Sequence, residues 1–420
     1  MERKHNDLWV GGPWEQPSRT VPPSPAMSQV HRPVLRVKRR RRKLLPVLIT
    51  VAVILSLVLA GMLIWYFDLL PNVRFERFYG GDFPFPYLDE DFDHREQTHD
   101  YSTPPAIPAA ATGTGVTITL ERGEESALSY EEIYNLCAPS IVSITTVSSA
   151  GANTGTGIVL TQDGYVLTNA HVVSGGNEVE VVTFDNRMAH ARLVGFDAAE
   201  DLAVLKVDMT GLTPARFGDS NELKSGQQVA AIGDSLGYRS TITDGIISAL
   251  DREVEVDDVT MTLIQTSAAI NFGNSGGALI DRFGRVVGIT TIKIVSGDGS
   301  AESMGFAIPS VRVKYVADRL IDGQTIIPGV LGITVNTLPV EGLGLEIISV
   351  TSGSDAEKKG LRPGDILLQV DGVDLTGVQI LSRAKIARGA GDTMVLTVAR
   401  EGQSFDVEVM LTDPSQLEGY

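Results

Sequence analysis

Hydrophobic positions between residues 129 and 325 recur in short runs that are separated by turns and are rich in β-branched residues. Short strands at such close spacing are typical of a β-sandwich or a pair of β-barrels. After a short helix in SYEEIYNLCAP, the runs are SIVSITTV, GTGIVLTQDGYVLTNAHVV, EVEVVTF, ARLVGFD, LAVLKVD, QQVAAIGD, DGIISALDR, MTLIQTS and GRVVGITTIKI. A helix in SVRVKYVADRLIDG, with Ser310 as its N-cap and Gly323 as its stop signal, is expected to close this mainly β domain.

A different pattern covers residues 326–413, where strands are mixed with two helices. Strand-like VLGITV and GLEIISV precede a short helix in SGSDAEKKG, the strand DILLQVDG, a helix near Thr376–Arg388 and the strands TMVLTVAR and FDVEVML. A segment of this size is enough for one small α+β module. Residues 414–420 are expected to form a short tail.

Residues 44–67 form an apolar stretch, LLPVLITVAVILSLVLAGMLIWYF, that contains no charged side chain. A helix needs about 20 such residues to cross a bilayer, so we expect one transmembrane helix that anchors the chain in the lipid bilayer. A cleaved signal peptide is the alternative. Its apolar core is only about 7–15 residues long, which makes it the poorer match.

The charge is distributed unevenly around this stretch. The chain has a formal net charge of −17, whereas residues 1–43 carry 11 Lys and Arg against 3 Asp and Glu, with RVKRRRRK directly before the apolar stretch. Basic residues beside a span prefer the cytoplasmic side, which predicts a disordered basic tail inside and residues 68–420 outside, in a single-pass protein of the cell membrane. A basic run can also bind nucleic acid, but the neighbouring span accounts for it, and we expect no such partner.

Residues 68–128 are rich in proline, acidic and small residues, as in DFPFPYLDEDFDH and STPPAIPAAATGTG. This composition predicts an extended linker that holds the folded part away from the membrane. The single cysteine, Cys137, has no partner for an intramolecular disulfide and cannot build a cysteine-rich metal site. We expect no metal or organic cofactor.

The stretch GNSGGAL places Ser275 among three glycines. A hydrolytic serine needs a base within hydrogen-bond reach and a carboxylate that holds that base in the right tautomer. Of the six histidines, only His171 and His190 lie in the β-rich region. His171, in TNAHVV, follows a strand and can face a cleft, so we predict that it is the base and that His190 is a solvent-exposed loop residue.

Asp201, in AEDLAVLKV, is the predicted carboxylate because the apolar run after it can draw it inward. A buried aspartate needs hydrogen bonds, and an imidazole N–H can provide one. Taken alone, Asp201 would be interpreted as a surface residue at the start of a strand. The glycines allow a tight turn whose backbone N–H groups converge as an oxyanion hole, and we assign its donors to Gly273 and Ser275.

Together these segments resemble the high-temperature-requirement A (HtrA) family of trypsin-like serine endopeptidases. The resemblance rests on TNAHVV, DLAVLKV, AIGDSLG, TDGIISALDR, QTSAAINFGNSGGALID and MGFAIPS, and covers roughly residues 129–413. It implies a chymotrypsin-like double β-barrel over 129–325 and a PDZ domain over 326–413, with His171, Asp201 and Ser275 as the catalytic triad. It also implies that misfolded or damaged extracytoplasmic proteins are the substrates and that the chain assembles as a homotrimer or higher oligomer.

Two positions depart from the family pattern, since Ser267 stands where aspartate is usual and Phe272 where proline is common. Both lie in the loop that leads to the nucleophile, so they bear on its resting conformation and activation. Ala269, six residues before the nucleophile, occupies the position that lines the primary specificity pocket in this fold. Without an acid there, we expect no preference for Lys or Arg. A pocket lined by Ala269, Ile270 and residues 292–304 would take small or medium aliphatic side chains.

The C-terminal module resembles a PDZ domain through VLGI, GSDAEKKGLRPGDILLQVDG and VLTVAREGQSFDVEV. Such modules take an extended peptide as an added strand and capture its terminal carboxylate on backbone N–H groups. Leu331, Gly332 and Ile333 would form that binding loop, and the alternative is an ordinary packing strand. A rival for the whole chain is a membrane-tethered peptide-binding or chaperone protein whose protease fold is retained but idle.

Overall fold

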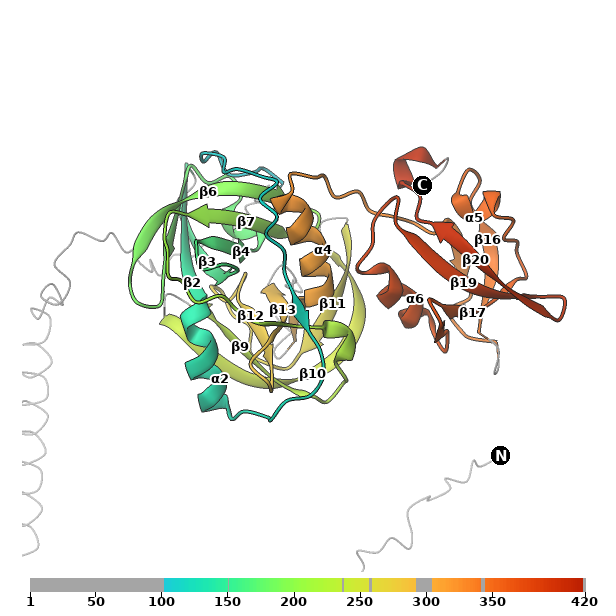
Figure 1. The fold of residues 1–420 in the computed structure, drawn as a ribbon, viewed down its shortest axis with the longest axis horizontal. Coiled ribbons are helices and arrows are strands. Elements are labelled where there is room, and N and C mark those ends of the chain that lie inside the picture. The colour runs from blue at the N-terminus through green and yellow to red at the C-terminus, as the bar shows by residue number, and fades with distance from the viewer. Residues whose placement is uncertain are drawn as a thin grey trace, which may run out of the picture. The chain divides into compact units, whose positions relative to one another are not determined.

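The computed structural model of the chain describes residues 102–149, 151–235, 238–256, 259–291, 304–340 and 344–417, and Figure 1 shows how their helices and strands are arranged. The basic tail at 1–43, the transmembrane helix at 44–67 and the first part of the linker, which we predict from sequence, lie outside these residues. Within the described ranges, no helix combines the length and the apolar character that a membrane crossing requires.

Six strands close the first barrel in the order β2-β3-β4-β7-β6-β5. Alternation of apolar and polar residues places one face of β2 inside, where Val142 and Ile144 are buried with Val181 and Leu205. The antiparallel pairing of β2 with β5 closes the ring. The strands are β2 (Ile141–Ser148), β3 (Gly151–Val159), β4 (Tyr165–Thr168), β5 (Glu178–Val182), β6 (Met188–Asp197) and β7 (Leu202–Val207).

A second set of six strands forms another ring, because β12 pairs with both β9 and β13, and β14 pairs with both β11 and β13. Its strands are β9 (Gln228–Ser235), β10 (Tyr238–Val256), β11 (Val259–Thr266), β12 (Ala278–Asp281), β13 (Val286–Thr291) and β14 (Gly305–Pro309). Two short parallel strands, β1 (Leu120–Glu121) and β8 (Phe217–Gly218), extend this sheet beside β13. The predicted pair of β-barrels is therefore confirmed.

Helices cover the barrels without interrupting them. They are α2 (Tyr130–Cys137), η2 (Ala138–Ser140), α3 (Ala170–Val173), η3 (Ser220–Glu222) and α4 (Ser310–Ile321). The α4 helix packs against β6 and β7 of the first barrel and against β13 and β14 of the second (Figure 1). It is followed by Gly323 at a φ of +73°, in agreement with the predicted stop.

The predicted N-cap of α4 is wrong. Pro309 occupies the N-cap position, and Ser310 is the first helical residue. The hydroxyl of Ser310 donates to the carbonyl of Gly218 at 2.6 Å and accepts the N–H of Ser220 at 3.0 Å. This serine therefore ties α4 to the β8 region instead of capping its own helix.

Part of the segment that we expected to be an extended linker packs on the barrels. The N–H of Ala106 donates to the carbonyl of Gly176, and that of Ala110 donates to Leu193. Ile118 is 5% exposed and belongs to the core that both barrels share. The apolar and β-branched residues of AIPAAATGTGVTITL explain this, because they supply apolar surface that an extended linker would leave in water.

The C-terminal module is a separate α+β unit with its own core, in which Leu345, Leu367, Leu396 and Val409 are fully buried. Its sheet has the order β15-β16-β17-β19-β20, with β18 paired to β17, so β15 is an edge strand. The elements are β15 (Ile333–Val335), β16 (Leu345–Val350), α5 (Asp355–Lys358), β17 (Ile366–Val370), β18 (Val373–Asp374), α6 (Val378–Lys385), β19 (Thr393–Arg400), β20 (Gln403–Met410) and η4 (Pro414–Gln416).

Candidate active site

His171 and Asp201 are in direct contact. The imidazole Nδ1 of His171 lies 2.9 Å from Oδ1 and 3.0 Å from Oδ2 of Asp201. An ionised carboxylate can only accept, so Nδ1 is the protonated nitrogen in this contact. His171 lies in the single turn of α3, directly after β4, and its side chain is 13% exposed. The contact with Asp201 thus fixes the orientation of the imidazole ring.

The carboxylate of Asp201 is 1% exposed and is saturated with hydrogen bonds. Besides the imidazole, it accepts the backbone N–H of His171 at 3.1 Å and the hydroxyl of Thr291 at 3.0 Å. A buried charge without such partners would cost several kcal/mol, on the order of 3–5. These three donors therefore make the burial of Asp201 tolerable and hold its two oxygens in place.

The turn that contains Ser275 lies between β11 and β12 and is bound on both sides. The carbonyl of Ser275 accepts the N–H of Thr156 at 2.8 Å, and the carbonyl of Gly273 accepts the hydroxyl of Thr156 at 2.7 Å. On the other side, the hydroxyl of Thr290 donates to the carbonyl of Asn274 at 2.6 Å. Strand β3 of the first barrel and strand β13 of the second thus fix the serine turn between them.

Gly276 brings this turn against the end of β4, where the loop to His171 begins. Its φ is +81°, and a Cβ at this position would lie 2.1 Å from the carbonyl oxygen of Thr156 and 2.4 Å from Oγ1 of Thr168. Only glycine fits such a conformation and such a close approach. The structure therefore places Ser275 in the same region as the His171/Asp201 pair, two residues after Gly273, whose φ is +94°.

Two backbone donors beside Ser275 are available to a ligand. Within the described part of the chain, the N–H groups of Gly273 and Ser275 donate to no protein acceptor. The neighbouring N–H groups of Asn274, Gly276 and Gly277 are all used, by Asn271, Thr290 and Asn274 respectively. This is the pair of donors that the sequence predicts for an oxyanion hole.

The residues expected to line the specificity pocket lie on the approach to the serine turn. Ala269 is exposed, and its carbonyl accepts the hydroxyl of Thr243 at 2.9 Å. Ile270 packs against Gly305 of β14, where a Cβ would lie 2.5 Å from Cγ1 of Ile270. Met304 is 49% exposed beside it, and residues 292–303 lie outside the described ranges.

The two departures from the family pattern have distinct surroundings. The hydroxyl of Ser267 accepts the N–H of Ile246 at 3.0 Å, which ties the start of the loop to β10. Phe272 is 74% exposed. It presents a large apolar surface to solvent only three residues before Ser275.

The alternatives to these residues are poorly suited to catalysis. His190 is 68% exposed, as predicted, but it lies in strand β6 and not in a loop, with Nδ1 at 3.2 Å from the carboxylate of Glu178. Burial raises the pKa of Cys137 to about 12, so its thiol is neutral near pH 7 and is a poor nucleophile. Among the described residues, no group of three or more His, Cys, Asp or Glu side chains is arranged to hold a metal ion.

Sequence reasoning missed the threonines that organise the site. Thr156 and Thr290 fix the serine turn, and Thr291 binds Asp201, yet a threonine in a strand resembles any other β-branched residue. The side chain of Asn169 donates to the carbonyl of Asp201 at 2.8 Å. Because Asn169 is part of the TNAH motif beside His171, its place in the sequence could have indicated that it belongs to the site.

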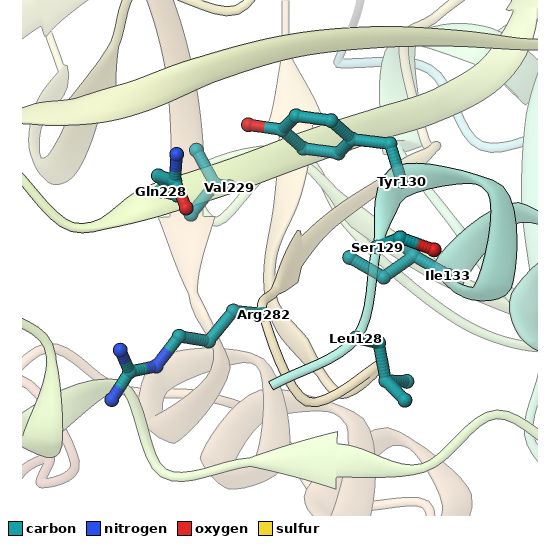
Figure 2. A pocket seen from close by; sticks show the side chains of 7 residues that line it. All are labelled: Leu128, Ser129, Tyr130, Ile133, Gln228, Val229 and Arg282. Atoms are coloured by element: carbon teal, nitrogen blue, oxygen red, sulfur yellow. The ribbon is translucent and has the colours of Figure 1, made fainter. Parts of the chain in front are cut away.

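A cavity of about 200 Å³ lies elsewhere, at the start of α2 (Figure 2). None of the active-site residues described above lines this cavity. The side chains around it are those of Leu128, Ser129, Tyr130, Ile133, Gln228, Val229 and Arg282.

The predicted peptide-binding loop of the C-terminal module leads into the edge strand β15. Leu331 is 4% exposed, and Ile333 begins β15 and pairs with Val350 of β16. Gly332 has a φ of +68°, and a Cβ there would lie 2.3 Å from Cβ of Ser354. The loop is therefore tightly packed on one side, while the outer edge of β15 has no neighbouring strand in the described sheet.

Comparison with known proteins defines the class of this protein. Residues 155–289 match the family model of a trypsin-like peptidase domain, and residues 329–411 match that of a PDZ domain. The order of the two matches is that of the barrels and the C-terminal module. The fold and the site therefore define a trypsin-like peptidase domain followed by a PDZ domain.

Relatives and solved structures narrow this class to a family. The chain is 39% identical to the serine protease Do-like HtrA of Lactobacillus helveticus in an alignment of 280 positions that covers 61% of this chain and 68% of the relative. It is 38% identical to a probable periplasmic serine endoprotease, DegP-like, of Chlamydia trachomatis over 271 residues, and spans about half, 54%, of that relative's length. The structure of the HtrA-type protease AlgW with a tripeptide aligns with a TM-score of 0.54 at 33% identity, over 68% of this chain and 97% of AlgW. The chain belongs to the HtrA/DegP family of trypsin-like serine endoproteases with a C-terminal PDZ domain.

The hydrogen bond between Asp201 and His171 can be tested with Asp201→Asn. The amide can donate to Nδ1 and then favours the wrong tautomer, so we expect kcat for casein hydrolysis to fall about 10⁴-fold while the fold is kept. The control is Asp208→Asn, the same change at a carboxylate that is 76% exposed at the end of β7. Initial rates and thermal unfolding of both variants check this. Equal loss in both would refute the assigned role of Asp201.

Proposed function

We propose that this chain is a membrane-anchored serine endopeptidase that hydrolyses misfolded or damaged extracytoplasmic proteins through His171, Asp201 and Ser275. The observation that carries the proposal is the contact of Nδ1 of His171 with the buried carboxylate of Asp201, at 2.9 Å. The serine turn is bound by Thr290 of β13, and the next residue of that strand, Thr291, binds Asp201. Family membership also supports the proposal, because the chain belongs to a family of trypsin-like serine endoproteases.

In the proposed reaction, Nε2 of His171 removes the hydroxyl proton of Ser275 as Oγ attacks the carbonyl carbon of a peptide bond. Asp201 stabilises the imidazolium that forms. The imidazolium then gives its proton to the leaving amine, and an acyl-enzyme remains. Water, deprotonated by His171, attacks this ester, releases the acid product and restores the serine.

The tetrahedral intermediate needs donors at the place where the carbonyl oxygen becomes negative. The unused N–H groups of Gly273 and Ser275 would supply them. Each such donor stabilises the transition state by about 2.7–4 kcal/mol. The hydroxyl of Thr156 binds the carbonyl of Gly273 at 2.7 Å and so holds the turn that contains both donors.

We further propose that the PDZ domain binds peptide C-termini by adding a strand to β15. The edge position of β15 and the tight loop at Leu331, Gly332 and Ile333 support this, since such recognition uses backbone hydrogen bonds and a carboxylate-binding turn. The related HtrA-type protease AlgW has been solved with a tripeptide.

The proposed location rests on the sequence and on the names of the relatives. A span at 44–67 would place the N-terminus in the cytoplasm and both folded domains outside, and four of the relatives are named probable periplasmic endoproteases. Assembly as a homotrimer or higher oligomer is proposed from the family alone. The exposed Phe272 and the altered Ser267 make an idle protease fold, in a chaperone or peptide-binding protein, the rival that an activity test must separate.

The first test compares Ser275→Ala with the unaltered full chain in casein degradation. We expect the variant to lose nearly all activity because the nucleophile is removed. The matched control is Ser225→Ala, in the exposed turn before β9. Gel densitometry over time measures the rates. Activity that survives in Ser275→Ala would exclude Ser275 as the nucleophile, and inactivity of the unaltered chain would favour the rival.

The specificity pocket is tested by mapping the cleavage sites in the same digests. With Ala269 and Ile270 near the serine turn and no acid among them, we expect cuts after small or medium aliphatic residues. Ala269→Asp would add a carboxylate and should move cuts toward Lys and Arg. Mass spectrometry of the fragments identifies the residue before each cut. Cuts after Lys or Arg by the unaltered chain would reject the pocket.

The PDZ loop is tested by fluorescence anisotropy with labelled peptides that end in a free Val, Leu or Phe carboxylate, each compared with its C-terminal amide. We expect the acid to bind at least about 10-fold more tightly, since a lost charged hydrogen bond costs about 1.5–3 kcal/mol. Gly332→Ala should abolish the difference through its clash with Ser354.

The control for the loop is Gly372→Ala. This glycine also has a positive φ, +78°, but a Cβ there would meet nothing within 4 Å. It should retain the preference for the free acid. Equal affinity of the acid and the amide for the unaltered chain would contradict carboxylate capture.

A further inference from the structure

The guanidinium of Arg312, in the first turn of α4, is held by the residue next to Asp201. Its Nε donates to Oε2 of Glu200 at 2.7 Å, and Nη2 donates to Oε1 of the same carboxylate. The two side chains are 14% and 13% exposed. Burial opposes the charge of Arg312, but its hydrogen bonds and ion pair with Glu200 outweigh this and raise the pKa of the guanidinium. A two-pronged contact of this kind fixes orientation as well as distance.

Glu200 lies in a tight turn that sets the backbone of Asp201. The N–H of Glu200 donates to Oδ1 of Asp197 at 2.9 Å, and the N–H of Asp201 donates to the carbonyl of Ala198 at 3.3 Å. Asp201 itself has a φ of +51°, in the left-handed region that few residues other than glycine adopt. Such a conformation persists only when its surroundings hold it. The anchored side chain of Glu200 is one of those surroundings.

The other side of the guanidinium faces the PDZ domain. Nη1 of Arg312 donates to the carbonyl of Ile386 at 3.1 Å and to that of Arg388 at 3.0 Å. Ile386 is the C-cap of α6. The last carbonyls of a helix lack partners within it and carry the negative end of its dipole, so a cation is well placed there. One arginine thus joins the turn of Asp201 to the end of α6.

We propose that Arg312 is a positioning residue for the His171/Asp201 pair, and that it completes the support of the Asp201 turn from the end of helix α6. The proposal rests on the proposed function, because Arg312 acts on the reaction only through Asp201. Arg312 touches neither substrate nor reacting atoms. Its effect is on how accurately the carboxylate meets the imidazole.

Three single variants, the double variant Glu200→Gln/Arg312→Met and one control distinguish this role from a general contribution of Arg312 to holding the PDZ domain on the barrels. Arg312→Met removes the positive charge and all hydrogen bonds of the guanidinium. Arg312→Lys keeps the charge but cannot make the two-pronged contact with Glu200. Glu200→Gln removes the negative charge on the other side of the pair. The control is Arg383→Met. Arg383, on α6, donates to Asp251 of β10 at 3.0 Å, so its loss breaks another ion pair between α6 and the barrels without touching the Asp201 turn.

In the full chain, we expect Arg312→Met and Glu200→Gln to lower kcat by about 10–100-fold with KM within about twofold, since small misplacements of catalytic groups cost this much. Arg312→Lys should be intermediate. The double variant Glu200→Gln/Arg312→Met should lower kcat no further than Arg312→Met alone, because the pair acts as one unit. Arg383→Met should keep kcat within about twofold of the unaltered chain.

A second measurement needs no activity. In the Ser275→Ala background, the low-field proton NMR signal of Nδ1–H of His171 reports its hydrogen bond to Asp201. It should shift or broaden in Arg312→Met and stay unchanged in Arg383→Met. If Arg312→Met does not fold, as judged by thermal unfolding, the more conservative Arg312→Lys and Glu200→Gln carry both measurements.

Two results would overturn the proposal. One is an unchanged kcat and an unchanged signal in the Arg312 and Glu200 variants. The other is a loss in Arg383→Met as large as that in Arg312→Met, which would indicate domain attachment in general. If the unaltered chain does not hydrolyse casein, the proposed function fails, and the NMR comparison alone decides for or against the role of Arg312.

Discussion

The buried carboxylate of Asp201 is the constraint on which the site depends. At 1% exposure it has lost its water, so its oxygens must be occupied by protein donors. Those donors come from distant parts of the chain, namely the ring and backbone of His171 and the hydroxyl of Thr291. The requirement that makes this buried charge tolerable is therefore also the one that sets the plane of the imidazole. Stability of the loop and orientation of the base have the same cause.

The serine turn shares this support through β13. Thr290 binds the turn and its neighbour Thr291 binds Asp201, so one strand links the two halves of the site. Thr156 of the first barrel binds the turn from the other side. Polar contacts of this accuracy need barrels that do not slide past one another. The shared apolar core meets that need, since it contains Ile158 and Leu202 of one barrel with residues of the other, such as Ile280.

Local chemistry explains what the sequence predicted correctly. Alternating and β-branched runs predicted the strands, and the need of a buried aspartate for a hydrogen-bond donor predicted the contact of Asp201 with His171. Contacts between residues far apart in the chain could not be predicted this way. Thr291 and Asp201 are 90 residues apart, and nothing in the local sequence distinguishes this threonine from its neighbours. Ser310 was misplaced for the same reason, because its hydroxyl bonds to Gly218, 92 residues earlier.

The adjacent acids Glu200 and Asp201 show how surroundings divide two like groups between different tasks. Asp201 faces the imidazole of His171, and in the proposed reaction its charge stabilises the imidazolium that forms. Glu200 faces Arg312, and the positive charge of Arg312 offsets the negative charge of Glu200 beside that of Asp201. Ion pairs shielded from water add little to net stability, because desolvation offsets most of their attraction. The Glu200–Arg312 pair therefore matters for geometry: it holds a turn that the left-handed backbone of Asp201 would otherwise tend to leave.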